Sequence, residues 1–324
     1  MATSLCSALA LAALLQAPPG SPLAGAPQVE SLAALRARVV RDSADGRAWL
    51  LLGRAYLRLV DGAHGPPDRA LQDSAWARAA LDTAEGALAR AAGLLDAGGP
   101  TPESDSARVL RVGAWSARAR LAWEERGTAA GPQEWGPVPL DLKLPPVLDE
   151  LGENLLRVCP MWGVLFTAGE ADWYAAWYMR FARGLRPDLL VMPLAAWRSD
   201  SALRAWVAAD LKLGRRRDGD GELAEVARHR PVCISMGFER APEARPRIKW
   251  AARPLLWVGG PEREGDRVPP RDFVFAALRM ALDEHDAWAD PALALYARAA
   301  RATPALCEAL ATFKVANQVA PCRK

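Results

Sequence analysis

The feature that most constrains the fold of this chain is a change in hydrophobic period near residue 160. Residues 162–167 are a short apolar run, residues 171–184 carry aromatic residues four apart, and residues 189–194 are a second apolar run. Short apolar runs bounded by turn residues are typical of buried strands, and a spacing of three or four is typical of a helix. A strand, a helix and a strand in succession predict parallel strands with a right-handed crossover.

The C-terminal half continues in the same way. Residues 231–236 and 254–258 are predicted to be further strands. A helix is expected at about 200–212, and the chain is predicted to be helical from residue 270 onward. We therefore predict an α/β domain over residues 158–324, with a Rossmann-like, mainly parallel short sheet and C-terminal helices.

The N-terminal part has helical spacing throughout and almost no runs of β-branched residues, so residues 27–127 are predicted to be all-α. The expected helices are residues 29–42, 47–60, 69–96 and 104–126. Asp-Gly, Gly-Pro-Pro and Gly-Gly-Pro sequences separate them, and such sequences favour turns.

One of these helices resembles the first helix of a tetratricopeptide repeat. The eight residues from Trp49 to Tyr56 fit the W-x2-L-G-x2-Y pattern, in which Gly53 lets a neighbouring helix approach closely. The face of a matching second helix would be Ala84, Leu88 and Ala91. The alternative is a plain helical bundle with a chance match. Because no polar cluster in this region indicates chemistry, we expect it to contact a protein partner or to pack on the second domain.

Two more segments complete the division of the chain. Residues 1–26 contain the apolar run LCSALALAALL followed by small residues, which is typical of a signal peptide; the alternative is a disordered Ala/Pro leader. A signal peptide predicts an exported protein, periplasmic or extracellular, and no later run is long enough to span a membrane. Residues 128–157 are rich in Pro and Gly and are predicted to be a linker that leads into a short helix.

Charge and metal-ligand spacing exclude several classes of function. The formal net charge is +3, and basic and acidic residues are interspersed along the chain. Nucleic-acid-binding proteins carry a basic stripe, so we expect no nucleic-acid partner. The chain has no CxxC motif and three scattered histidines, so we expect no metal site and no cofactor.

Cysteine usage agrees with export. Four cysteines follow the leader: Cys159, Cys233, Cys307 and Cys322. An even number in an oxidising compartment predicts two disulfides. Cys159 and Cys233 each begin a predicted strand, and these strands could be neighbours in one sheet. Cys307 and Cys322 bracket the terminal helix, and we favour this second pair as a bridge. Buried free thiols are the alternative.

The segment from Phe166 to Tyr178 contains the candidate site, because Glu170 and Asp172 lie where the first strand ends and a helix begins. In open α/β sheets ligands bind at the carboxyl ends of strands. The candidate ligand-binding residues are Thr167, Gly169, Glu170, Asp172, Trp173, Trp177 and Tyr178. Asp172 has a structural alternative as a helix cap. The aromatic residues are either core or a platform on which a sugar stacks.

The stretch from Gly163 to about Leu194 resembles the soluble C-terminal region of bacterial membrane proteins related to protein O-mannosyltransferases, a domain of unknown function. The residues that carry the resemblance are Leu165, Phe166, Thr167, Gly169, Asp172, Trp177, Tyr178, Gly184, Arg186, Pro187 and Asp188. The last three form the turn into the second strand. Ala168 and Ala171 stand where that family has amides, and Glu170 where it has an aspartate. The membrane-embedded part is absent, so the resemblance implies an extracytoplasmic accessory domain and no transferase.

These observations favour an exported, non-catalytic accessory protein of the cell envelope. It would bind a protein partner through the helical region and a glycan or small molecule at the end of the first strand. The alternative is a carboxylate-dependent glycoside hydrolase or glycosyltransferase-like enzyme that uses Glu170 and Asp172. Such an enzyme needs two carboxyl groups on either side of the scissile bond, roughly 5–9.5 Å apart.

Overall fold

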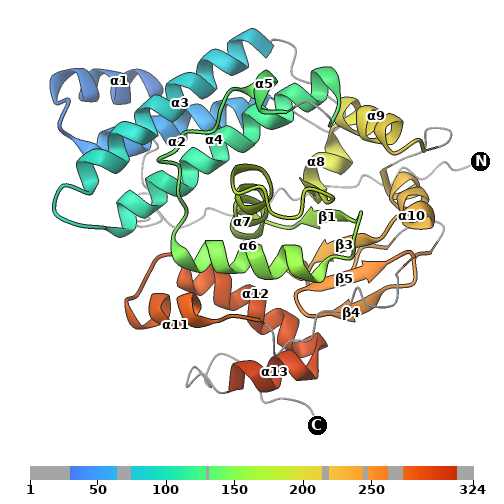
Figure 1. The fold of residues 1–324 in the computed structure, drawn as a ribbon. Helices are drawn as coiled ribbons and strands as arrows, with labels where there is room; N and C mark the ends of the chain where they lie inside the picture. Colours follow the sequence, from blue (N-terminus) through green and yellow to red (C-terminus); the bar gives the residue numbers. More distant parts are fainter. Residues whose placement is uncertain are drawn as a thin grey trace, which may run out of the picture.

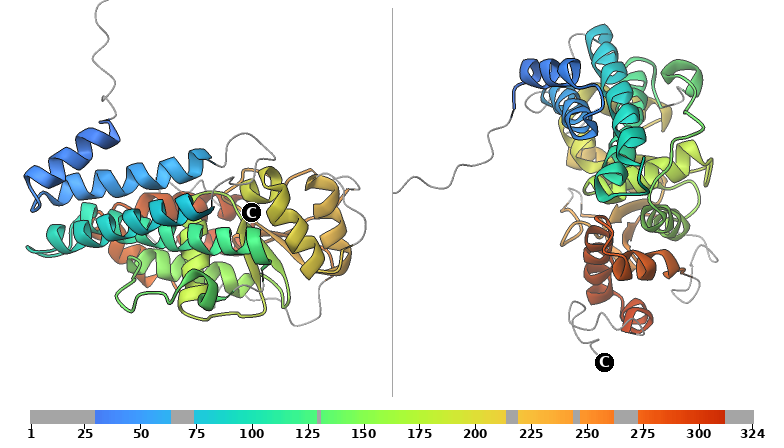
Figure 2. Two further views of the ribbon diagram at one scale, coloured as in Figure 1. Left: turned by 90° about the horizontal axis from the view of Figure 1, so that it is seen from above. Right: turned by 90° about the vertical axis from the view of Figure 1, so that its left-hand side faces the viewer.

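The structure is a computed structural model of the chain, and it describes residues 30–63, 74–128, 131–213, 219–243, 247–261 and 273–311. The predicted leader and Cys322 lie outside these ranges. Helices dominate, and they surround one small sheet (Figure 1). The N-terminal helices and the C-terminal helices lie at opposite ends of the molecule (Figure 2).

The N-terminal region is helical, as its periodicity predicts. Its helices are α1 (Leu32–Arg41), α2 (Gly46–Ala63), α3 (Ser74–Leu95) and α4 (Pro102–Arg126). Two of them begin at a capping side chain: Ser31 accepts a hydrogen bond from the Ala34 N–H, and Thr101 accepts one from the Ser104 N–H. Each cap pairs an N–H group that the first helical turn leaves without a partner. In this order α2 packs on α3, and α3 packs on α4.

Gly53 is a point of close approach between α2 and α3. A Cβ atom at Gly53 would lie 2.5 Å from Cγ of Leu88 and 3.2 Å from the carbonyl oxygen of Ala84. Both of these α3 residues are fully buried, and Tyr56 on α2 is 6% exposed. The expected close approach at Gly53 is therefore present. This close approach shows that the two helices are tightly packed. The relationship to tetratricopeptide repeats stays a prediction.

Helix α4 joins the helical region to the rest of the molecule. Leu110 and Ala114 belong to a core shared with α1, α2 and α3. Val112, Trp115 and Trp123 belong to a second core, which includes the sheet. One long helix with two apolar faces must be buried on both sides. The two parts are consequently packed against each other through α4.

The predicted linker contains two helices, α5 (Pro132–Trp135) and α6 (Pro146–Val158). The second is the expected short helix, and it lies in the core with Leu148, Leu151 and Leu155 fully buried. It touches the next helix closely, because a Cβ at Gly152 would lie 2.4 Å from the carbonyl oxygen of Ala175. This part of the chain therefore forms part of the core between the two regions.

The sheet has five strands in the order β2-β1-β3-β5-β4. The strands are β1 (Val164–Thr167), β2 (Leu190–Pro193), β3 (Val232–Ser235), β4 (Ala251–Arg253) and β5 (Leu256–Gly259). Strand β1 pairs in parallel with β2 and with β3, as the strand–helix–strand pattern predicts. The other two pairings, β3 with β5 and β5 with β4, are antiparallel.

The prediction of a mainly parallel sheet is therefore corrected to a mixed sheet. The reason is the short strand β4, which the sequence analysis missed. It returns into β5 through Pro254 and Leu255, and a connection of two residues can only join antiparallel strands. Leu255 has φ 67°, a conformation that glycine or asparagine usually supplies. The usual sequence signal of a hairpin is consequently absent.

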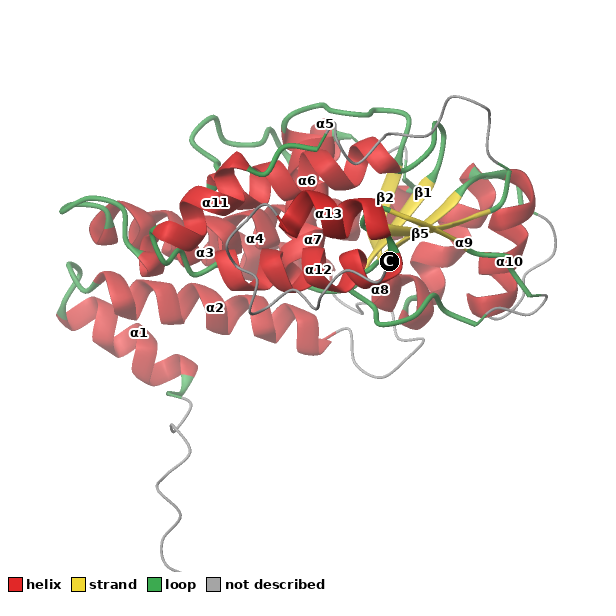
Figure 3. Ribbon diagram, turned by 90° about the horizontal axis from the view of Figure 1, so that it is seen from below, coloured by secondary structure: helices red, strands yellow, loops and turns green. Residues whose placement is uncertain are grey.

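Helices pack against the faces of this sheet, and β4 forms one of its edges (Figures 1 and 3). Between β1 and β2 the chain forms α7 (Glu170–Trp177), which widens into the single π-turn η1 (Tyr178–Ala182). The remaining helices are α8 (Leu194–Ser199), α9 (Ser201–Asp210), α10 (Gly219–His229), α11 (Ala276–Asp283), α12 (Ala289–Ala302) and α13 (Pro304–Ala311). Within the described ranges, no helix combines the length and the apolar character needed to cross a membrane.

Candidate functional site

The candidate site lies at the carboxyl ends of β1 and β3. These strands are parallel neighbours, so Thr167 and Ser235 end at the same edge of the sheet. The chain leaves β1 towards β2 on one side and leaves β3 towards β4 and β5 on the other. Adjacent strands whose connections run in opposite directions leave a crevice between them, and ligands of open α/β sheets bind there.

A pocket of about 410 Å³ occupies this position. Its walls come from the loop after β1, from Gly237 after β3, and from α12, which packs beside α7 (Figure 3). The lining residues that matter for recognition are Gly169, Glu170, Asp172, Gly237, Trp288 and Arg298. The pocket thus combines two segments that sequence analysis identified with a third, α12, that it did not.

Asp172 organises the loop after β1. Its Oδ2 accepts a hydrogen bond from the Ala168 N–H at 2.7 Å, and its Oδ1 accepts one from the Gly169 N–H at 2.7 Å. The hydroxyl of Ser235 donates to the same carboxylate. A carboxylate at the third position of a helix that accepts the N-cap N–H is a capping interaction. The structure therefore shows Asp172 in the capping role that was the alternative to ligand contact.

The electrostatics of Asp172 follow from its burial. The residue is 2% exposed. Loss of hydration raises the pKa of its carboxyl group, and the hydrogen bonds from Ser235, Ala168 and Gly169 oppose that rise. Backbone packing completes the arrangement: a Cβ at Gly237 would lie 2.6 Å from the Cβ of Ala168 and 3.2 Å from Oδ2 of Asp172. Asp172 is thus a positioning group that joins the ends of β1 and β3.

The charged side chains that solvent and a ligand can reach are Glu170 and Arg298. Glu170 is exposed at the first position of α7. Arg298 lies on α12, where its Nε donates to the carbonyl oxygen of Met236 at 3.2 Å. This bond holds the guanidinium at the end of β3. In the described part of the chain Arg298 makes no ion pair, so its terminal nitrogens are available as donors.

The aromatic residues of the candidate segment are mostly core, which corrects part of the predicted site. Trp177 is fully buried in a cluster with Trp135 and Phe181. Tyr178 is 3% exposed and donates to the carbonyl oxygen of Leu142 at 2.9 Å. A helix that is packed between α6 and the sheet must bury its large side chains on both faces. Neither residue can therefore serve as a platform for a sugar.

Three other predicted site residues offer the pocket no reactive side chain. Thr167 is 1% exposed, and its hydroxyl has no partner among the described residues. Trp173 is half-buried against the main core. Gly169 is exposed at the N-cap of α7. Of the seven predicted ligand-binding residues, Gly169, Glu170 and Asp172 line the pocket.

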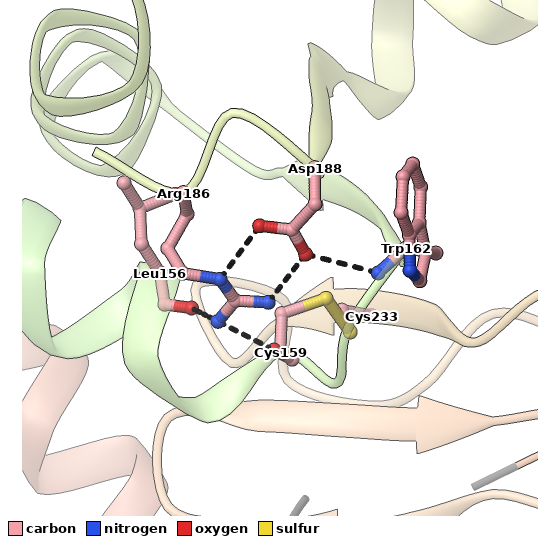
Figure 4. The surroundings of a disulfide bond; sticks show 6 residues. All are labelled: Leu156, Cys159, Trp162, Arg186, Asp188 and Cys233. Carbon is pink, nitrogen blue, oxygen red and sulfur yellow. Dashed lines mark hydrogen bonds and ion pairs between the residues drawn. A yellow bond between two sulfur atoms is a disulfide. The ribbon is translucent and has the colours of Figure 1, made fainter. Parts of the chain in front are cut away.

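The predicted turn at Arg186, Pro187 and Asp188 is an ion-paired corner (Figure 4). Arg186 donates from Nε and Nη2 to both carboxylate oxygens of Asp188, and from Nη1 to the carbonyl oxygen of Cys159. Asp188 also accepts from the Trp162 N–H at 3.0 Å. The bonds from Arg186 lower the pKa of Asp188 to about 2. The motif therefore fixes the amino end of the sheet, far from the pocket.

The same corner contains a disulfide between Cys159 and Cys233 (Figure 4). Cys233 lies on β3, as expected. Cys159 does not begin a strand, because it is the C-cap residue of α6, five residues before β1. Our preferred bridge, Cys307–Cys322, cannot be placed because Cys322 lies outside the described residues. Cys159 and Cys233 are 1% and 0% exposed, so the bond is inaccessible to solvent.

Sequence reasoning missed Arg298 and Trp288, which come from a helix far along the chain. No local motif marks them, and only the tertiary packing of α12 on α7 brings them to the pocket. Ser235 ends β3, and Gly237 follows the third predicted strand. The edge of the sheet that they share with Thr167 was the sequence signal for them.

Comparison of the chain with family models, with curated proteins and with solved structures gives no match. Within the described residues, no three His, Cys, Asp or Glu side chains are grouped closely enough to hold a metal ion. The pocket is therefore interpreted from its own residues.

Proposed function

We propose that this chain is a non-catalytic accessory protein of the cell envelope that binds a saccharide in the pocket at the ends of β1 and β3. The observation that carries the proposal is the combination of Glu170, Arg298 and Trp288 around one cavity. A carboxylate accepts two hydrogen bonds and a guanidinium donates several in a fixed fork, which suits the neighbouring hydroxyl groups of a sugar. An indole adds an apolar surface with a polar edge, which suits the C–H face of the ring.

The pocket size and position support the same proposal. A volume of about 410 Å³ is within the range of small-molecule sites and is large enough for one or two sugar rings. The switch-point location supports a Rossmann-like relationship for the α/β part. The close approach of α2 and α3 at Gly53 supports a tetratricopeptide-like relationship for the helical part.

The geometry favours binding over hydrolysis. Two carboxyl groups that flank a scissile bond must both reach the substrate. Asp172 is 2% exposed, and both of its oxygens accept backbone hydrogen bonds, whereas Glu170 is exposed. In the described part of the chain, no second reactive carboxylate lines the pocket opposite Glu170.

Export and a protein partner are part of the proposal. The Cys159–Cys233 disulfide supports an oxidising compartment, because such bonds persist outside the cytosol. The helical region exposes large apolar side chains that a partner would cover. They are Val40 at 83%, Leu51 at 40%, Leu59 at 43% and Trp76 at 40% exposure.

The proposal is tested by calorimetric titration of the protein with neutral, acidic and amino sugars and short oligosaccharides. Arg298→Ala is expected to weaken binding of the best ligand by about tenfold or more, because a hydrogen bond to a charged group contributes roughly 1.5–3 kcal/mol.

The matched control is Arg301→Ala, which removes the same charge from an exposed position on the same helix and is expected to leave binding unchanged. Equal affinities of the Arg298→Ala variant and the wild type would contradict the proposed site. Turnover of any glycan by the purified protein would contradict its non-catalytic character.

A further inference from the structure

A second surface, which shares no lining residue with the pocket, carries two exposed positive charges. It is the segment Arg247–Lys249, which precedes the edge strand β4 and which we call the cationic ridge. Arg247 and Lys249 are exposed, and Ile248 between them is 9% exposed. This alternation places both cations on the solvent side of the segment.

The ridge is held rigidly by its neighbours. A Cβ at Gly259 of β5 would lie 2.5 Å from Ile248 and 3.0 Å from Trp250, so both apolar side chains pack onto the bare backbone of that glycine. The indole Nε1 of Trp250 donates to the carbonyl oxygen of Pro242 at 3.1 Å. The ridge therefore extends β4 on the side of its first residue, Ala251, which pairs with Val258 of β5.

One acidic residue, Glu243, lines the larger of the two hollows beside the ridge together with both of its cations. Arg247 and Lys249 make no ion pair with any residue in the described part of the chain. Arg228 on α10 adds a third cation nearby, but it is paired with Glu225 at 2.6 Å. A basic pair that is held in place and makes no ion pair with a described residue attracts anions.

The ridge separates two hollows and lines both of them. One has a volume of about 860 Å³ and extends past Pro242 and Trp250. The other has a volume of about 360 Å³ and extends past Arg228 and Gly260. Both include Arg247, Ile248 and Lys249, so a long ligand could cross the ridge and occupy the hollow on each side.

We propose that the cationic ridge binds a linear acidic polysaccharide, whose carboxylate or sulfate groups pair with Arg247 and Lys249. Two cations two residues apart in an extended segment are separated by about 7 Å, which suits an anion repeated along a chain more than a single compact anion. Two hollows on either side of the ridge also favour an extended ligand. A nucleic acid would need a longer basic stripe than this one pair supplies. The site does not depend on the pocket at β1 and β3.

The test measures binding of the full chain to dextran sulfate and to polygalacturonate, with neutral dextran as the uncharged polymer, at two salt concentrations. We expect both acidic polymers to bind, neutral dextran not to bind, and binding to weaken as salt increases. The Arg247→Ala/Lys249→Ala double variant is expected to lose at least about tenfold in affinity.

The control is the Lys143→Ala/Arg279→Ala double variant, which removes one Lys and one Arg from exposed positions elsewhere. It is expected to bind like the wild type. An equal loss in this control would overturn the proposal, since attraction would then depend on net charge alone. A single-stranded oligonucleotide of equal charge that binds more tightly through Arg247 and Lys249 would also overturn it. Near-ultraviolet circular dichroism verifies that each variant is folded. Retained polymer binding in Arg298→Ala separates this site from the saccharide pocket.

Discussion

Replacing both Cys159 and Cys233 by alanine is expected to lower the free energy of unfolding by about 4 kcal/mol, because the bond closes a long loop in the unfolded chain. The two cysteines are 74 residues apart in sequence. Without the bond, the unfolded chain regains the conformations that the loop closure removed. The measurement is chemical denaturation followed by tryptophan fluorescence.

A double-mutant cycle provides the control for this prediction. Either single replacement breaks the same bond, so Cys159→Ala, Cys233→Ala and the double variant are expected to lose similar amounts of stability. Additive single effects would show that the residues contribute only through packing. They would contradict a disulfide in the native protein, and with it one support for an oxidising compartment.

Asp172→Ala is expected to lower the free energy of unfolding by about 2–4 kcal/mol, since it leaves several buried donors without an acceptor. The donors are the N–H groups of Ala168 and Gly169 and the hydroxyl of Ser235. Asp172→Asn, which keeps the shape and one acceptor oxygen, is expected to lose less. Thermal and chemical denaturation of the two variants measure the difference.

Glu170→Ala is the matched comparison, because it removes a carboxylate two residues away on the same helix. Glu170 is exposed, and substitutions at such positions usually change stability by less than about 0.5 kcal/mol. It is expected to affect saccharide binding instead. The reverse pattern, with Glu170 stabilising the fold and Asp172 dispensable, would contradict the roles assigned to the two residues.

Much of the fold could be predicted because local pattern and tertiary packing agree. The strand–helix–strand pattern at residues 162–194 predicted the parallel pairing of β1 and β2, and Gly53 predicted where α2 and α3 touch. The sequence analysis missed β4 for a physical reason. A strand of three half-buried residues, Ala251–Arg253, has neither a continuous apolar run nor a glycine in its turn.

The sequence could predict where the candidate site lies, but only some of the residues that line it. The end of β1 was identified because sheet topology places ligands there, whatever the side chains. Trp177 and Tyr178 were assigned to the ligand because sequence alone cannot distinguish the inner face of a helix that is packed on both sides. Arg298 escaped prediction because its role depends on α12, which packs on α7 from a remote part of the chain.

The most direct test of the saccharide site is the response of the tryptophan indole and glycine amide signals in nuclear magnetic resonance spectra during titration with sugars. The chain has 13 tryptophans, so the Trp288 indole signal is assigned through a Trp288→Phe variant. The account predicts that a binding sugar shifts the signals of Trp288, Gly169 and Gly237, while the buried Trp177 signal stays in place. Shifts confined to other parts of the molecule, or no shift with any sugar tested, would contradict it.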